Sequence, residues 1–323
     1  MESSQEDPAA LNRQLQYTPR QRGPHLIAVT GATGRTGRRV VANLLAGGEK
    51  VRALGRDPQK LAPLVEHGAE PWVGDLADVA WLTTALTGAS AVYLVLPEDM
   101  SQPNLRSYQE HISTGYAAAV ANSHVAFVVN LSSLGAQHAH GTGPIVGLHD
   151  QEQMLNRLDG VNVLHIRAAY FMENLFMSLA PLKASGILPG GMRGDLAMPW
   201  IATQDIAAYA AARLAARDFS GHLTHELHGQ RDISMHEAAA VVRKAIGKPK
   251  TAYVQVPGPA LEASLLQMGM PKKNAELILE MWNGANSGLI APEKARSVAN
   301  STPTTLEAFV RETFVPAYQH AMG

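Results

Sequence analysis

The chain of 323 residues contains no cysteine. This absence excludes a disulfide framework, a zinc site built from thiolates and a cysteine nucleophile. It is also typical of a cytoplasmic protein, which is the location that we expect. An excess of one charge is lacking as well, because the formal net charge is −1 and no long run of basic residues occurs. Binding to nucleic acid or to an anionic membrane surface is therefore not expected.

Long apolar runs are also missing from the sequence. No stretch reaches the roughly 18–20 apolar residues that a membrane-spanning helix needs, so no contact with the membrane interior is expected. Residues 1–23 are polar and lack the apolar segment of a signal peptide, and we expect them to form a mobile leader. Apolar residues make up 46% of the chain and charged residues 17%, which indicates a folded, globular protein.

A glycine-rich turn lies between a predicted strand and a predicted helix. Residues 26–30 are apolar with a β-branched bias, as in a buried strand, and residues 38–46 carry apolar side chains at helical spacing. Glycine lets the backbone approach a pyrophosphate, and the N-terminus of the following helix offers N–H groups and a positive dipole end. The residues predicted to contact a dinucleotide are Gly31, Thr33, Gly34, Arg35, Thr36 and Gly37.

The end of the next predicted strand, residues 50–54, indicates which nicotinamide cofactor to expect. NAD-binding enzymes usually carry an acidic residue there, which binds the ribose 2′-hydroxyl. Asp57 precedes Pro58 and a helical pattern, so we interpret it as an N-cap. Arg56 would then face the ribose, where a guanidinium suits the 2′-phosphate of NADP, and Arg35 could add a second charge. The alternative is that both arginines are solvated surface residues. NADPH is favoured, and NAD is the weaker prediction.

Two further predicted strands end in candidate cofactor contacts. Strand 69–73 leads into Gly74, Asp75 and Leu76, where Asp75 could also cap a helix over 76–86. Strand 89–96 ends at Leu96 and Pro97, and the segment after it is expected to lie over the nicotinamide side of the cofactor. Ligands of open α/β sheets bind at these carboxyl ends of strands.

Strand 125–131 is followed by two serines at the same edge of the sheet. Ser133 is a candidate hydroxyl donor to a substrate carbonyl, and Ser132 is a second candidate or a cofactor contact; capping of the loop is the alternative. Residues 135–148 are rich in glycine and histidine and are predicted to form a flexible lid. His138 and His140 lack a nearby carboxylate or thiolate, so no metal site is expected.

Strands alternate with helices over about the first 165 residues. This alternation predicts an α/β fold with a doubly wound parallel sheet (a Rossmann fold) and a nucleotide-binding domain over residues 24–167. Residues 168–323 are predicted to form a smaller, mainly helical substrate cap, with some strands returning to the main sheet. Glycines and prolines interrupt residues 182–200, which we expect to be loops lining the cleft between the two parts.

These motifs resemble the short-chain dehydrogenase/reductase superfamily, and in particular its atypical, NmrA-like branch. The resemblance covers residues 25 to about 215, and the motifs that carry it are 31–37 (GATGRTG), 52–56 (RALGR), 74–76 (GDL), 130–133 (NLSS), 166–174 (IRAAYFMEN) and 200–207 (WIATQDIA). It implies NAD(P) binding, with Asp75 near the adenine amine. The branch includes quinone reductases, dye reductases and a redox-sensing regulator, so the resemblance alone does not establish catalysis.

The catalytic pair of the superfamily is missing. Its enzymes carry Tyr-x-x-x-Lys at the start of the helix after the serine strand, where the tyrosine acts as general acid. The corresponding predicted helix, 149–158, begins with His149, and no tyrosine lies between Tyr116 and Tyr170. His149 could replace the acid, because imidazole titrates near neutral pH, or it could simply cap or pack the helix. Tyr170 is a weaker candidate.

Three functions follow from this pattern. The favoured one is an NADPH-dependent reductase that transfers hydride to a quinone, dye or similar conjugated small-molecule acceptor, for which a tyrosine acid is dispensable. The second is a sensor of NADP(H) that signals through a protein partner without turnover. The third is a carbonyl reductase with His149 as acid. Both a protein partner and a homodimer stay open at this point.

Overall fold

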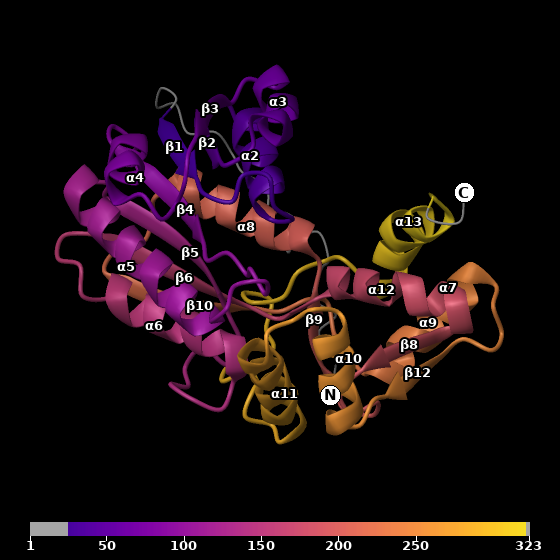
Figure 1. Cartoon of the computed structure of the whole chain (residues 1–323). Coiled ribbons are helices and arrows are strands. Elements are labelled where there is room, and N and C mark those ends of the chain that lie inside the picture. Colours follow the sequence, from indigo (N-terminus) through magenta and orange to yellow (C-terminus); the bar gives the residue numbers. More distant parts are fainter. Residues whose placement is uncertain (1–24, 321–323) are drawn as a thin grey trace, which may run out of the picture.

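The computed structural model describes residues 25–320 (Figure 1). The predicted leader, residues 1–23, lies outside the described residues. Among the helices of the described range, none is both long and apolar enough to cross a membrane.

Seven parallel strands form the main sheet, in the order β10-β6-β5-β4-β1-β2-β3. The strands are β1 (Leu26–Val29), β2 (Lys50–Gly55), β3 (Glu70–Val73), β4 (Ala91–Val95), β5 (Phe127–Ser133), β6 (Asn162–Ala168) and β10 (His222–Leu227). The chain builds the sheet outward from β1 in one direction and then from β4 in the other. β1 and β4 therefore flank the topological switch point, where open α/β sheets bind their ligands.

Helices cover both faces of this sheet, because successive strand residues point to opposite sides. Ile27 and Val29 join one core, whereas Ala28 joins the core on the other face. The first core includes α2 (Gly37–Ala46), α3 (Pro58–Glu66) and α8 (Thr203–Ala216). The second includes α4 (Val79–Leu86), α5 (Leu105–Ser123) and α6 (Val146–Leu155). The predicted doubly wound α/β fold is confirmed.

The elements after β6, apart from α8 and β10, form what we call the C-terminal part (residues 170–201 and 232–320), which lies beside the main sheet in Figure 1 and has a core of its own. Its large side chains include Trp200, Phe309 and Phe314. Two small sheets contribute, and their strands are β7 (Tyr170–Phe171), β9 (Met198–Ile201) and β11 (Asp232–Ile233) in one, and β8 (Ile187–Gly190) and β12 (Ala252–Gln255) in the other.

The helices of this part surround the two small sheets. They are a 3₁₀ segment (Met172–Ser178), α7 (Leu179–Ser185), α9 (Met235–Ile246), α10 (Gly258–Gln267), α11 (Lys272–Asn286), α12 (Leu306–Phe309), a π-helical turn (Val310–Phe314) and α13 (Val315–His320). In Figure 1, α11 lies between the main sheet and the smaller sheets. It is therefore placed to touch loops of both parts.

Two predicted helix boundaries were wrong. α4 begins at Val79, and its N-cap is Asp78, which accepts hydrogen bonds of 3.0 Å from the N–H groups of Ala80 and Trp81. A cap at Asp78 satisfies N–H groups that Asp75, three residues earlier, does not reach. α6 begins at Val146, after a 3₁₀ turn over Gly143–Ile145, and not at His149.

The segment 182–200 also differs from the prediction of cleft-lining loops. It contains β8 and β9, which pair with β12 and with β7 and β11. β12 lies about sixty residues further along the chain, at 252–255. Because β8 and β9 depend on partners that are distant in sequence, and β8 contains Pro189 and Gly190, the local pattern of residues 182–200 indicated loops.

Candidate functional site

The glycine turn leaves β1 and enters α2 at the carboxyl edge of the main sheet. Gly31 has a φ of +58°, in the left-handed region that favours glycine. The N–H of Gly34 donates to the carbonyl of Gly31 at 2.8 Å and closes the turn. A Cβ on Gly37 would lie 2.1 Å from the same carbonyl oxygen. Only glycine therefore lets α2 start this close to β1.

The turn exposes hydrogen-bond donors at the positive end of α2. Thr33, Gly34 and Arg35 are exposed, whereas Thr36 is buried beneath them. No acceptor within residues 25–320 bonds the backbone N–H of Thr33 or Arg35. Free N–H groups at a helix N-terminus suit the oxygens of a diphosphate. The backbone geometry fits a dinucleotide, and the individual contacts stay predictions.

Arg56 and Asp57 follow β2 next to this turn. The Asp57 carboxylate accepts hydrogen bonds from the N–H of Gln59 at 2.9 Å and of Lys60 at 3.4 Å. Its predicted role as the N-cap of α3 is confirmed. Arg56 is exposed, and no carboxylate of the described chain forms an ion pair with it. Its guanidinium is available to a phosphate.

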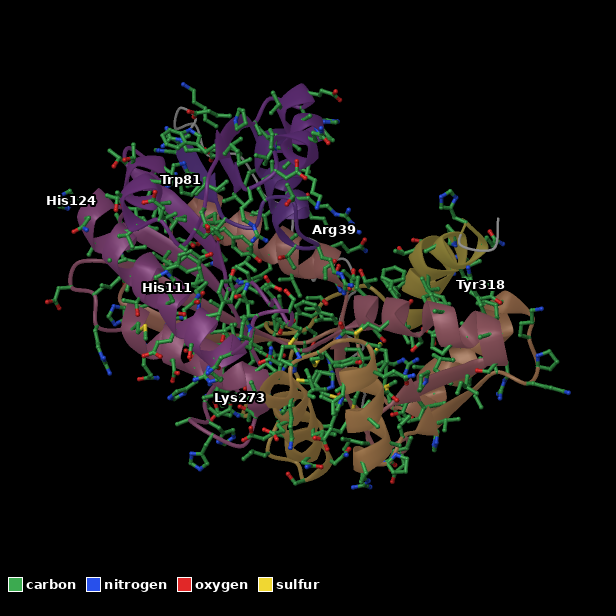
Figure 2. The ribbon with its side chains drawn as sticks, viewed as in Figure 1. Arg39, Trp81, His111, His124, Lys273 and Tyr318 are labelled. Atoms are coloured by element: carbon green, nitrogen blue, oxygen red, sulfur yellow. The ribbon has the colours of Figure 1, made fainter. Side chains whose placement is uncertain are left out.

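Gly74 and Asp75 shape the turn after β3. A Cβ on Gly74 would lie 2.2 Å from the ring of Trp81, a residue of α4 that Figure 2 labels. The exposed Asp75 carboxylate accepts the N–H of Ala77 at 3.0 Å, so it stabilises the turn and does not cap α4. Leu76 is half-buried against the core that α4 and α5 share. The adenine contact of Asp75 stays a prediction.

The exit from β4 is held against β1 by hydrogen bonds. The N–H of Val95 donates to the Thr30 hydroxyl at 3.0 Å, and the Tyr116 hydroxyl donates to the carbonyl of Val95 at 2.8 Å. Leu96 is buried and Pro97 is half-buried. These contacts determine the direction in which the chain leaves the switch point.

Two carboxylates on this exit, Glu98 and Asp99, were missed by the sequence prediction. The side chain of Glu98 is exposed in part. Desolvation by the surrounding protein raises the pKa of its carboxyl group, and the charge of Arg35 opposes this rise. Hydrogen bonds chiefly from Ser101 lower the pKa of Asp99, and Arg56 adds to this effect. Their position directly after a central strand was the signal that could have identified them.

Ser132 forms part of a buried network at the ends of β5 and β6. Its hydroxyl donates to Glu152 at 2.6 Å, and Arg167 donates to the two oxygens of that carboxylate at 3.1 and 2.7 Å. Arg167 also reaches Glu293 at 2.9 Å. The Ser133 hydroxyl, which is half-buried, donates to the carbonyl of Leu134 at 2.9 Å. Ser132 thus joins strand to helix, and Ser133 is the more accessible of the two hydroxyls.

His149 lies in the first turn of α6 and is half-buried. Its Nδ1 is 2.8 Å from the carbonyl oxygen of Ala136. A carbonyl only accepts, so Nδ1 carries a proton and Nε2 of the neutral ring is an acceptor. His149 can therefore donate a proton through Nε2 only when the ring is charged.

The predicted lid over residues 135–148 is packed and not open. A Cβ on Gly143 would lie 2.0 Å from the carbonyl oxygen of Leu277 in α11, and Pro144 and Ile145 are buried. His138 and His140 belong to the same segment. Within residues 25–320, no three histidine or carboxylate side chains are grouped closely enough to hold a metal ion.

Tyr170 belongs to β7, at the edge of the core of the C-terminal part. Its ring centroid lies 4.9 Å from that of Trp200 and 6.4 Å from that of Trp282. The ring is half-buried, and burial raises the pKa of the hydroxyl. A raised pKa makes it a weaker acid near neutral pH, and this chain provides no lysine nearby in sequence to lower it.

Comparison with known proteins assigns the family. A sequence model of the NmrA-like family matches residues 24–310. A (4-alkanoyl-5-oxo-2,5-dihydrofuran-3-yl)methyl phosphate reductase of Streptomyces griseus is 30% identical over 224 residues, which cover 69% of this chain and 75% of that protein. Quinone oxidoreductase 2 of Escherichia coli is 29% identical over 289 residues, which cover 87% of this chain and 95% of that protein.

A solved structure agrees with this match. The NADPH-dependent quinone oxidoreductase of Escherichia coli, crystallised with NADPH, superimposes with a TM-score of 0.73 at 24% identity, over 92% of this chain and 100% of that chain. At this identity the superposition by itself shows a common fold. The resemblance predicted from the sequence motifs is confirmed. The chain belongs to the NmrA-like family.

Proposed function

We propose that this protein is an NADPH-dependent reductase that transfers hydride to a quinone, a dye or a similar conjugated small molecule. The observation that carries the proposal is a dinucleotide turn at the switch point of the sheet, in a chain without the Tyr-x-x-x-Lys pair. Two NmrA-like relatives, the dihydrofuranone phosphate reductase and quinone oxidoreductase 2, bear names of reductases. If no hydride acceptor bound at this site, the same geometry would bind the cofactor without catalysis.

The residues of this chain would divide the work between holding the cofactor and admitting the acceptor. When bound, NADPH supplies a hydride, so the chemistry that the protein must add is mainly positioning. The N–H groups of the glycine turn would bind the diphosphate, and Arg56 with Arg35 would bind the 2′-phosphate. Leu96 and Pro97 would exclude water beside the nicotinamide ring.

Proton delivery separates the proposed acceptors from simple carbonyl compounds. A reduced quinone or dye is a stabilised anion, so water can protonate it and no dedicated acid is needed. The bond between His149 and Ala136 leaves Nε2 as an acceptor in the neutral ring, which suits binding of a hydroxyl group more than proton donation. A carbonyl reductase that depends on His149 is therefore the weaker alternative.

The proposal is tested by anaerobic mixing of the pure protein with NADPH and a panel of quinones and dyes, followed at the absorbance band of reduced nicotinamide. Turnover above the uncatalysed rate is expected. Gly34→Val should abolish it while preserving the fold, because a Cβ on Gly34 would meet only the Gly31 carbonyl, at 3.1 Å, and the side chain would project toward the diphosphate site. Circular dichroism of the variant controls for the fold.

Other results would point elsewhere. Saturable NADPH binding without turnover of any acceptor would contradict the reductase and support a sensor that acts through a protein partner. Turnover that persists in Gly34→Val would contradict the placement of the diphosphate. A cytoplasmic location and a homodimer stay predictions from the sequence.

A further inference from the structure

Asn274 is a fully buried amide in the first turn of α11. Its Nδ2 donates to the carbonyl of Met100 at 3.0 Å and to that of Gln102 at 2.7 Å. Its Oδ1 accepts the N–H of Leu105 at 3.0 Å. All three partners lie about 170 residues earlier in the chain, in the segment between β4 and α5 that we name the exit loop (residues 96–105).

The chemistry of this contact requires an amide. A side-chain amide has two N–H donors and one carbonyl acceptor, and Asn274 uses all of them on backbone groups. Leu105 is the first residue of α5, so its N–H has no partner within the helix, and Oδ1 supplies one. An aspartate would keep this acceptor and lose both donors. A leucine of similar size would take the hydrogen-bond partner from three backbone groups, of which the N–H of Leu105 is buried and the other two are partly buried.

The exit loop also carries two carboxylates whose charge responds to the predicted cofactor arginines. The charge of Arg35 opposes the rise in the pKa of Glu98, and the charge of Arg56 helps to lower the pKa of Asp99. The Asp99 side chain is itself held within the loop, because it accepts hydrogen bonds from the Ser101 hydroxyl at 2.6 Å and from the Gln102 amide at 2.8 Å. A shift of the loop would therefore change the charge that faces both arginines.

α11 is firmly anchored and provides a fixed reference for this loop. Glu280 accepts the N–H of Gly141 at 2.8 Å, and Asn286 exchanges hydrogen bonds with the backbone at Gly191 (3.0 Å) and Arg193 (2.7 Å). Figure 2 labels Lys273, the neighbour of Asn274, at the end of α11 that faces the main-sheet helices. The helix thus holds three loops, and only its first turn binds the exit loop.

We propose that Asn274 is a positioning residue for NADPH binding, which holds the exit loop where it leaves β4 at the switch point of the sheet and begins with the predicted cofactor contacts Leu96 and Pro97. The inference rests on the proposed cofactor site, and it adds a residue outside the nucleotide-binding motifs. It assigns to α11 of the C-terminal part an effect on cofactor affinity that acts through this loop.

The test compares two asparagines of the same helix. Asn274→Ala should raise the Kd of NADPH at least tenfold, and Asn286→Ala, which also removes two hydrogen bonds to backbone, should leave this Kd within twofold of the parent protein. Binding is measured by fluorescence titration at a temperature where both variants are folded by circular dichroism. Hydrogen exchange of residues 98–105 should rise only in Asn274→Ala.

A second variant separates positioning from a general loss of stability. Asn274→Asp keeps the acceptor for Leu105, and protonation of the buried carboxyl restores one donor. Its NADPH Kd, divided by that of the parent protein at each pH, should approach one as the pH falls from 8 to 5.5, while the same ratio for Asn274→Ala stays high.

Clear outcomes would overturn the inference. Equal losses of affinity in Asn274→Ala and Asn286→Ala would show that α11 matters only for stability, and an unchanged Kd in Asn274→Ala would show that the exit loop needs no such anchor. Because these readouts measure binding, they hold even if no acceptor is reduced. If the parent protein bound no NADPH, the proposed function itself would fail first.

Discussion

The main sheet and the C-terminal part are stabilised by contacts of different range. In the main sheet, apolar side chains of β1 and β4 pack against helices that lie next to them in the chain order, such as α2 and α5. In the C-terminal part, polar side chains join distant segments, as where the Tyr253 hydroxyl of β12 donates to the carbonyl of Met192 at 2.6 Å. Apolar packing depends on the periodic spacing of many apolar residues, whereas a hydrogen bond between distant segments depends on the identity of one side chain.

This difference explains how the site is assembled. The main sheet presents the glycine turn, Arg56 and the exit loop at one edge because strand order alone brings these loops together. The C-terminal part then adjusts that edge through a few side chains, of which Asn274 is the best defined. Substitutions in the two parts should therefore have different effects on stability and on binding.

The largest effect is expected from Gly37→Val in the main sheet. A Cβ there would lie 2.1 Å from a backbone oxygen, so β1 and α2 must move apart. We expect a loss of about 3 kcal/mol in the free energy of unfolding, measured by urea denaturation. Gly34→Val is the matched control, because its Cβ lies 3.1 Å from the nearest atom. Equal stability of the two variants would contradict the close approach of α2.

A polar chain inside the main sheet should make stability depend on pH. Burial lowers the pKa of His165 from 6.5 to about 4, and the neutral ring is bonded to Asn130 and Asn156 at 3.0 Å each. Between these two values the unfolded chain binds a proton that the folded protein excludes. Stability is therefore complete above pH 6.5 and falls as the pH drops toward 4, by up to about 3 kcal/mol.

His165→Gln removes this titration and provides the comparison. Its unfolding free energy should vary less between pH 6.5 and 4 than that of the parent protein. Because His225 and His228 also have lowered pKa values, only the difference between the two profiles is informative. Superimposable profiles would show that His165 does not contribute.

At the start of α8, where this helix is bonded to the C-terminal part, Thr203→Val removes a single buried hydroxyl. The Thr203 hydroxyl and N–H both donate to the Glu173 carboxylate, with the N–H at 3.1 Å from each oxygen. Loss of the hydroxyl should destabilise the protein by about 1–2 kcal/mol. Thr203→Ser keeps the hydroxyl and should be close to the parent. NADPH affinity should not change. A loss of affinity together with the loss of stability would contradict the expected separation between effects on stability and effects on binding.

A change in binding energy, and not in stability, is expected at the carboxyl edge of the main sheet. Arg56→Ala should weaken NADPH binding about tenfold, or roughly 1.4 kcal/mol, and should affect NADH much less. Arg38→Ala, another exposed arginine near the glycine turn, is the control and should change both affinities little. Equal losses for NADPH and NADH would exclude a role for Arg56 at the 2′-phosphate.

Several features of the main sheet could be predicted from local sequence alone. The glycine turn, the cap at Asp57 and the strand–helix alternation follow from spacings of a few residues. The start of α4 was misplaced because two aspartates, Asp75 and Asp78, compete as caps within four residues. Sequence could not choose between them, since both bind backbone N–H groups two residues ahead.

Local sequence patterns predict the main sheet of this protein, its glycine turn and the absence of the usual acid pair. The bond of Ser132 to Glu152, the bond of His149 Nδ1 to Ala136 and the anchoring of the exit loop by Asn274 become visible only in the folded structure. The two kinds of feature differ in the sequence separation of the residues involved. Helical and strand periodicity are visible within a few residues, whereas a buried hydrogen bond between segments 170 residues apart depends on the whole fold.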